Sequence, residues 1–401
     1  MAVSARAARL TSGTILRSRR GKQLRKEVFI LTPEPPEVIG GMQTFLRAQI
    51  RGFEEHGYAV RVFHRGNSGC TSLLRAVQRI SNYLADPFVG LVVGRAAQRA
   101  IHENVLAVVS DSVVGWYPLH LPARCKLLHF HHGTYRGYAE VNRKHISRLG
   151  YLKMKWWDSM VLENLSVRHK LVLCNSGQTA QEVLRFYGQP SQVVPLIANF
   201  DYAPLDQTEC RRKLDLPLDS RVGVFVGSIH PMKNFPIVRA LVEALPDVHW
   251  LIALRGEIPE HRFPHSNVRI FRDALPSALR VIYSAANFSL CPSLYEPFGY
   301  VVAEALACGT PVVAAPGGAS SLFLSEPPLD QLLVSSSTDP KPFVEAALRV
   351  LAKPDFYRRY VLEHVRPRIV ELMSPENWWR RFFEVTGLPD LSSTFNGFIR
   401  D

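Results

Sequence analysis

The stretch SLCPSLYEPFGYVVAEALACGTPVVAAPGG, residues 289–318, packs two apolar runs and a helical pattern into a short length of chain. The run through Leu290 predicts a buried strand, residues 297–308 have helical spacing, and residues 311–315 predict a second strand. Pro297 suits a first helical turn, and Gly309 suits a left-handed residue after a helix end. The stretch therefore predicts a β-α-β unit of a parallel sheet.

The start of the predicted helix offers groups that bind anionic oxygen. The backbone N–H groups of Phe298, Gly299 and Tyr300 have no partners inside the helix, and Gly299 lets a ligand approach closely. Glu296 precedes the helix and Glu304 lies two turns into it, so both can reach a cleft at the carboxyl end of the sheet. Carboxylates accept paired hydroxyls, which predicts a ligand with phosphates and hydroxyls, such as a nucleotide sugar. A structural unit with solvated glutamates is the alternative.

Three segments of this stretch, residues 292–299, 304–313 and 317–318, together resemble the donor-site signature of the family 4 retaining glycosyltransferases. The resemblance implies an α/β protein of the GT-B fold, with two Rossmann-like domains facing across a cleft and a C-terminal helix crossing back to the first domain. It also implies transfer of a hexose from a nucleoside diphosphate sugar to an acceptor hydroxyl, with retention at the anomeric carbon.

The expected domain organisation follows from this resemblance. Residues 1–26 form a basic tail, and residues 27–205 an N-terminal, acceptor-side domain that also receives a last helix at about 376–401. Residues 206–375 form the nucleotide-sugar-binding domain.

The first domain opens with a predicted strand at Glu27–Thr32 and a helix at 42–56, joined by a loop that ends in Gly40 and Gly41. The glycine pair resembles the first loop of the family, which faces the donor, although such a pair can also be only a turn. His132, followed by Gly133 at a strand end, matches the family's His-Gly position and is expected to contact a sugar hydroxyl. The residues from Tyr138 to His169 are expected to be helical, with Trp156 and Trp157 partly buried.

The second domain opens with a predicted strand at 221–227, followed by a loop that contains Ser228 and Lys233. The family has Gly-Arg here and then a lysine that neutralises the diphosphate, so Gly227 and Lys233 match but Ser228 replaces the arginine. Arg255 or His230 is the expected substitute for that cation.

These assignments predict a mechanism. Lys233 and the helix start at Phe298 to Tyr300 would stabilise the leaving diphosphate. Glu296 would hold the hexose hydroxyls and stabilise positive charge at the reacting carbon, and Glu304 would hold the ribose. The sequence contains no Asp-x-Asp motif, so we expect a metal-independent enzyme without a cofactor. A uridine diphosphate sugar is the preferred donor and GDP-mannose the alternative, while the acceptor stays open.

Composition sets the remaining expectations. The chain has 401 residues, 47% of them hydrophobic, and a net charge of +13, of which eight charges lie in the acid-free segment Met1–Lys26. We interpret this segment as a solvated terminus, with a transit peptide or a peripheral contact to anionic lipid as alternatives. No apolar run is long enough to span a membrane, and the six cysteines are scattered, so a cytoplasmic protein is expected.

Three other functions fit parts of the pattern. A nucleotide-sugar epimerase of the same fold would act without an acceptor. A basic binding protein is the second alternative, but no aromatic and basic recognition motif appears, so no nucleic acid is expected. Because Ser228 replaces a cation, a partner subunit without activity is the third.

Overall fold

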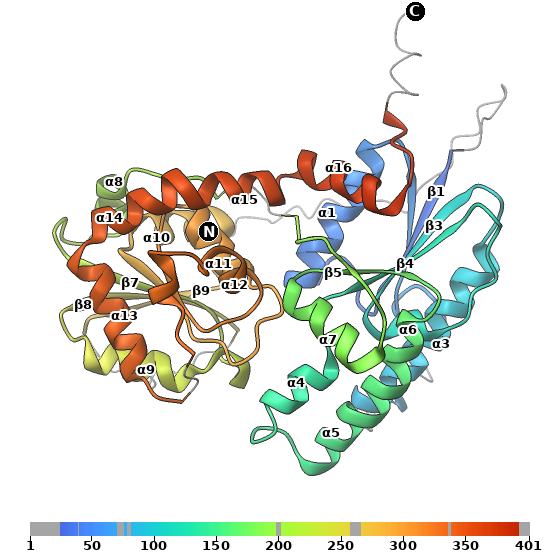
Figure 1. The fold of residues 1–401 in the computed structure, drawn as a ribbon, viewed down its shortest axis with the longest axis horizontal. Helices are drawn as coiled ribbons and strands as arrows, with labels where there is room; N and C mark the ends of the chain where they lie inside the picture. Colours follow the sequence, from blue (N-terminus) through green and yellow to red (C-terminus); the bar gives the residue numbers. More distant parts are fainter. Residues whose placement is uncertain are drawn as a thin grey trace, which may run out of the picture.

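The first domain is built on a six-stranded parallel sheet (Figure 1). The computed structural model describes residues 25–38, 40–69, 76–77, 82–197, 202–256, 266–335 and 338–392, so the expected basic tail lies almost wholly outside the described residues. The strands are β1 (Glu27–Leu31), β2 (Ala59–Phe63), β3 (Val105–Asp111), β4 (Lys126–His131), β5 (Leu171–Cys174) and β6 (Gln192–Val193). Their order is β2-β1-β3-β4-β5-β6, so the connections change direction between β1 and β3. Open parallel sheets bind ligands at such a point.

Helices connect these strands. They are α1 (Gly41–Glu55), α3 (Asn82–Ala100), α4 (Tyr135–Val141), α5 (Arg148–Leu152), a π-helical segment (Lys153–Glu163), α6 (Asn164–Val167) and α7 (Gly177–Tyr187). Helix α7 begins after the N-cap Ser176, whose hydroxyl accepts the Thr179 N–H. The expectation that Trp156 and Trp157 are partly buried is wrong, because their exposed fractions are 58% and 48%.

The second domain has a five-stranded parallel sheet in the order β11-β10-β7-β8-β9. Its strands are β7 (Arg221–Ser228), β8 (Val248–Arg255), β9 (Val268–Arg272), β10 (Phe288–Cys291) and β11 (Val312–Ala314). Its helices are α8 (Gln207–Lys213), α9 (Phe235–Ala244), α10 (Pro276–Ala285), α11 (Tyr300–Ala307), α12 (Gly318–Phe323), α13 (Lys341–Ala352) and α14 (Pro354–Tyr360). The direction of the connections changes between β7 and β10, which places the loops after these two strands side by side.

Two last helices, α15 (Arg366–Met373) and α16 (Pro375–Thr386), cross from the second domain back to the first, along the top of Figure 1. The Trp378 indole donates a hydrogen bond to the Pro195 carbonyl, and the Trp379 ring lies on Phe53 at 4.7 Å between centroids. Gly52 makes room for this ring, because a Cβ there would lie 2.0 Å from the Trp379 Nε1. The predicted return of the last helix to the first domain is therefore confirmed.

Candidate functional site

The loops after β7 and β10 meet at the centre of the second sheet. The Leu294 N–H donates to the Met232 carbonyl at 2.7 Å, which joins the two loops through their backbones. Beside this link, the Lys233 Nζ lies 2.5 Å from Glu296 Oε2, and the Ser293 hydroxyl donates to the same oxygen at 3.1 Å. Residues far apart in sequence thus form one paired-charge site where an open α/β sheet binds ligands.

Lys233 keeps its charge in this site. Burial works to lower the pKa of Lys233, but the Glu296 carboxylate opposes it and the pKa ends above its ordinary value. Lys233 and Glu296 are only 19% and 16% exposed, so little water screens them. The site therefore offers a fixed ammonium and a carboxylate to a ligand.

The helix that follows Glu296 begins later than its sequence predicts. Helix α11 starts at Tyr300, and Gly299 is its N-cap with a φ of +86°, so Pro297 and Phe298 precede the helix. The prediction that Pro297 occupies the first turn is wrong. The cause is the left-handed backbone at Gly299, which turns the chain just before the helix.

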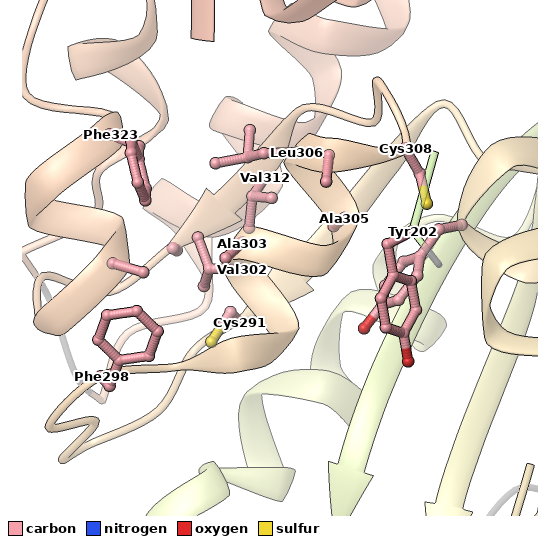
Figure 2. Close-up of a cluster of buried hydrophobic side chains, with 14 of the residues drawn as sticks. Tyr202, Cys291, Phe298, Val302, Ala303, Ala305, Leu306, Cys308, Val312 and Phe323 are labelled. Atoms are coloured by element: carbon pink, nitrogen blue, oxygen red, sulfur yellow. The ribbon is translucent and has the colours of Figure 1, made fainter. Parts of the chain in front are cut away.

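The side chain of Phe298 belongs to the hydrophobic core and is 3% exposed. Figure 2 shows it among the buried residues around α11, with Cys308 near the other end of the helix. Gly317 and Gly318 pack against this loop, because a Cβ at Gly318 would lie 2.2 Å from the Phe298 carbonyl oxygen. A ligand could therefore contact only the backbone of Phe298, because its side chain is buried.

Helix α11 ends as predicted. Gly309 has a φ of +81°, its N–H donates to Leu306, and the Thr310 N–H donates to Ala305. This pair of bonds satisfies the last carbonyl groups of the helix. Glu304, inside the helix, is partly buried and accepts a hydrogen bond from the Tyr283 hydroxyl at 3.3 Å.

Glu304 holds its proton more firmly than an exposed glutamate. Burial raises the pKa of Glu304 to about 7, although hydrogen bonds from Tyr283 and Tyr202 and the charge of Arg255 act in the opposite direction. Near neutral pH the group therefore changes between an acid that donates a hydrogen bond and a carboxylate that accepts them.

Arg255 lies next to the position where the family arginine is missing. Ser228 and Arg255 are register partners at the carboxyl ends of β7 and β8, and the charge of Arg255 acts on Lys233. His230 is engaged otherwise: its Nδ1 accepts the Met232 N–H at 3.2 Å, and burial followed by the charge of Lys233 lowers its pKa. Of the two expected substitutes, Arg255 is the one with a permanent charge. Gly227, just before Ser228, lies close to the Lys233 side chain.

The first domain places its own predicted residues beside the donor-side loop and α11. The Gly41 Cα faces the Tyr300 ring, because a Cβ there would lie 3.7 Å from Cδ2, whereas Gly40 has an extended backbone that any residue adopts. His132 follows β4 and stacks on Phe130 at 5.4 Å. Gly133 touches the donor-side loop, since a Cβ there would lie 2.6 Å from the Pro297 Cγ.

His132 has a charged neighbour that the sequence did not reveal. Its Nε2 lies 3.5 Å from Asp111 Oδ1 at the end of β3. Within the described part of the chain, neither ring nitrogen of His132 nor that carboxylate oxygen has a hydrogen bond. These buried atoms therefore have hydrogen-bonding capacity that no described protein group uses. In the same described ranges no three His, Cys, Asp or Glu side chains are grouped so as to hold a metal ion.

Sequence reasoning also missed the contacts that join the two domains. The Tyr295 hydroxyl donates to Glu182 Oε2 at 2.7 Å and accepts the Thr134 N–H at 2.9 Å. The Tyr300 hydroxyl donates to the Ile197 carbonyl at 2.9 Å. The one available signal was the position of Tyr295 and Tyr300 in the loop and helix that carry Glu296 and Glu304.

Comparison with known protein families identifies the chain. Residues 39–200 match the family model for Glycosyltransferase Family 4, and residues 220–353 match the model for Glycosyl transferases group 1. The two matches take up most of the chain and contain nearly all of the two sheets. The chain belongs to the family 4 glycosyltransferases. The donor-site resemblance read from residues 289–318 is thereby confirmed at the level of the family.

Curated relatives of this family 4 member match only part of the chain. D-inositol 3-phosphate glycosyltransferases of Mycobacterium bovis and Mycobacterium tuberculosis are 32% identical over 163 residues, which are 37% of this chain. The match spans only 34% of the length of these relatives.

Solved structures establish the fold. Sucrose-phosphate synthase from Thermosynechococcus elongatus aligns with a TM-score of 0.71 and 20% identity, over 90% of this chain and 98% of that one. HepE from Anabaena, solved in complex with UDP-glucose, aligns with a TM-score of 0.63 and 15% identity, over 90% of this chain and 99% of that one. The predicted GT-B fold is confirmed.

Proposed function

We propose that this family 4 protein is a retaining glycosyltransferase that moves a hexose from a nucleoside diphosphate sugar to an acceptor hydroxyl. One observation carries the proposal: Lys233 and Glu296 form a 2.5 Å ion pair at the switch point of the second sheet. A fixed cation suits a diphosphate, and an adjacent carboxylate suits the hydroxyls of the sugar attached to it.

The other site residues complete the donor site in this proposal. The start of α11 at Tyr300 and the exposed Arg255 add positive charge around the phosphates, with Arg255 in the role of the cation missing at Ser228. Glu304 holds the ribose hydroxyls in its ionised form. His132, with Asp111 beside it, holds a hydroxyl of the hexose from the first domain.

The reaction we propose is a displacement on one face of the sugar. The bond from the anomeric carbon to the diphosphate oxygen breaks, the acceptor oxygen bonds to the same face of that carbon, and the acceptor proton passes to the leaving diphosphate. Lys233 stabilises the negative charge that develops on the leaving group, and Glu296 stabilises the positive charge on the sugar. Protein cations fill the role of a metal in this scheme, so a chelator should leave the rate unchanged.

A uridine diphosphate sugar is our preferred donor, with GDP-mannose as the alternative. HepE, which has the same fold, was solved with UDP-glucose, and this supports the preference. The mycobacterial relatives are named for D-inositol 3-phosphate, so a phosphorylated cyclic polyol is the first acceptor to test.

Donor binding followed by product analysis tests the proposal. A bound donor raises the melting temperature of the full-length chain, so UDP-glucose, other UDP-sugars and GDP-mannose are screened by thermal shift. With the donor that binds, Glu296→Gln should retain binding and lose turnover, whereas Glu345→Gln, an exposed substitution in the same domain, should change neither. A failure of every donor to bind would overturn the proposal, and so would release of free epimerised sugar without any transfer.

A further inference from the structure

Residues 148–167 form a helical stretch that exposes large apolar side chains and buries several polar ones, beside the buried Met154, Leu162 and Val167. The stretch comprises α5, the π-helical segment and α6. Among the side chains packed against the domain are Asp158, Ser159, Glu163 and Ser166, each at most 2% exposed. The opposite side exposes large apolar side chains, namely Leu149 at 79%, Leu152 at 50%, Trp156 at 58%, Trp157 at 48%, Met160 at 37% and Leu165 at 39%. An exposed group of this kind usually marks a contact surface.

Hydrogen bonds on the buried side hold the helix in this orientation. The Ser159 hydroxyl shares a hydrogen bond with the Tyr187 hydroxyl of α7 at 2.9 Å, and the Lys153 ammonium lies 3.9 Å from the Asp86 carboxylate of α3. Glu163 accepts the Tyr135 N–H at 3.0 Å and a hydrogen bond from the Tyr187 hydroxyl. Rotating the helix to bury its tryptophans would break these bonds and expose the domain core, so the apolar side faces outward as part of the native fold.

The exposed charges within residues 141–170 are all positive, and Glu140, just before this range, is paired with Arg136. Between residues 141 and 170, which lie wholly inside a described range, the acidic residues are Asp158 and Glu163, and both are buried. Arg143, Lys144, Arg148 and Arg168 are exposed. The Lys155 Nζ lies 5.8 Å from the centre of the Trp156 ring, and the Arg143 guanidinium lies 5.2 Å from that of Tyr151.

We propose that this surface docks on a bilayer that contains anionic lipid. We define the docking face by its apolar and cationic side chains, which are Leu149, Leu152, Trp156, Trp157, Met160 and Leu165 with Arg143, Lys144, Arg148, Lys155 and Arg168. Tryptophan rings favour the headgroup level, leucine and methionine enter the acyl boundary, and Lys and Arg pair with lipid phosphates. Among the described residues, no helix is long and apolar enough to cross a membrane.

The chemistry of the docking face favours lipid over a protein partner. Trp, Met and Arg also occur at protein interfaces, but this face carries cations and offers no exposed acid to pair with those of a second copy of the basic chain. The face also lies near the contact between the domains, because α4 follows its N-cap Thr134, which bonds Tyr295 of the second domain, and ends at the loop that holds Arg143 and Lys144. Figure 1 shows α4 and α5 together at the lower edge of the first domain. Docking would therefore hold the first domain, which is the acceptor side in the proposed function, against the bilayer. Only this last consequence rests on the proposed function.

Co-sedimentation of the full chain with vesicles tests the proposal. The vesicles are phosphatidylcholine alone, or phosphatidylcholine with phosphatidylglycerol. We expect the parent chain to bind the anionic vesicles. Two double variants, Trp156→Ser/Trp157→Ser and Arg143→Glu/Lys144→Glu, should each bind these vesicles about tenfold or more weakly than the parent. Matched variants on the second domain, Leu275→Ser/Phe356→Ser and Arg212→Glu/Lys213→Glu, replace equally exposed residues and should bind as the parent does.

Three outcomes would overturn the proposal. The first is that the parent chain does not bind anionic vesicles. The second is that the double variant Trp156→Ser/Trp157→Ser binds as well as the parent, which would place any lipid contact elsewhere, such as the basic segment 1–26. The third is that the parent sediments as a dimer while this double variant sediments as a monomer, which would assign the face to a second copy of the chain. The melting-temperature increase given by a bound donor should be the same in all variants, so a failure of docking is distinguishable from a failure of the proposed function.

Discussion

The Tyr295 hydroxyl of the second domain donates a hydrogen bond to the Glu182 carboxylate of the first domain at 2.7 Å. It also accepts the Thr134 N–H at 2.9 Å, so one hydroxyl joins the two domains through two bonds. Tyr295 immediately precedes Glu296, which pairs with Lys233. The approach of the two domains and the position of the proposed catalytic carboxylate are thus set by adjacent residues of one loop.

Replacing Tyr295 with phenylalanine should lower kcat/KM for the donor about tenfold, because a hydrogen bond to a charged group contributes about 1.5–3 kcal/mol. Nucleotide binding to the second domain should change much less. Steady-state rates and nucleotide titration measure the two effects. Tyr360→Phe removes a hydroxyl that bonds Pro327 far from the cleft and is the control. Unchanged rates in Tyr295→Phe would show that this bond does not contribute to closure.

Lys233→Met should weaken binding of a nucleoside diphosphate sugar about tenfold to a hundredfold, because it removes a charge-assisted hydrogen bond to phosphate. It also leaves the Glu296 carboxylate partly buried without its cation, so the variant should be less stable than the parent. Adding Glu296→Gln should restore stability but not binding. Isothermal titration and chemical unfolding separate these effects, with the exposed Lys213→Met as control. Full donor affinity in Lys233→Met would exclude Lys233 from the diphosphate site.

Binding of UDP-glucose should tighten as pH rises from 6 to 8 if the ionised form of Glu304 holds the ribose. Burial raises the pKa of Glu304 to about 7, so below that pH the carboxyl is mostly protonated, and binding must first remove a proton. Affinity should fall up to about tenfold per pH unit below pH 7 and level off above it. UDP-glucose is preferable to UDP, whose terminal phosphate titrates at about pH 6. In Glu304→Gln the affinity should be lower and independent of pH; the same pH profile in the variant would assign the titration to another group.

The sequence predicted the structure correctly where a local pattern of residues determines it. The apolar runs and Gly309 of the stretch 289–318 predicted β10, α11, β11 and the helix end, because burial period and a left-handed residue are local properties. Lys233 and Glu296 were both predicted to be site residues. Their pairing follows from the strand order β10-β7, which brings the two loops together.

The sequence failed where long-range contacts decide the structure. The helix start was placed at Pro297, because a local pattern does not show that Gly299 turns the chain. Trp156 and Trp157 were expected to be partly buried, yet Ser159 and Glu163 hold the opposite side of the helix inward through hydrogen bonds with Tyr135 and Tyr187. Tyr295 was missed because its partners are more than 100 positions away in the chain.

Gly318→Ala should destabilise the second domain by about 2 kcal/mol or more. Gly318 has a φ of +37°, and an added Cβ would lie 2.2 Å from the Phe298 carbonyl oxygen, which is backbone and cannot move aside alone. Chemical unfolding measures the change. Gly177→Ala, at the first turn of α7, meets no atom within 4 Å and should be neutral or slightly stabilising. Equal stability of both variants would show that the contact between Gly318 and the donor-side loop is not required.

Glu163→Gln should make the protein progressively more stable than the parent as pH rises from about 5 to about 8. Burial raises the pKa of Glu163 to about 8, while the unfolded chain loses this proton near the ordinary glutamate value. Between these pH values the native parent binds more protons than its unfolded state, so rising pH destabilises it, and glutamine does not titrate. His131, whose Nε2 lies 3.9 Å from Glu163 Oε1, has its pKa lowered by burial to about 4, so it is neutral in the native protein across this range, and its titration in the unfolded chain is common to both proteins. Urea unfolding across this pH range measures the difference, with the exposed Glu54→Gln as control; a constant difference would show that Glu163 is ionised in the native protein.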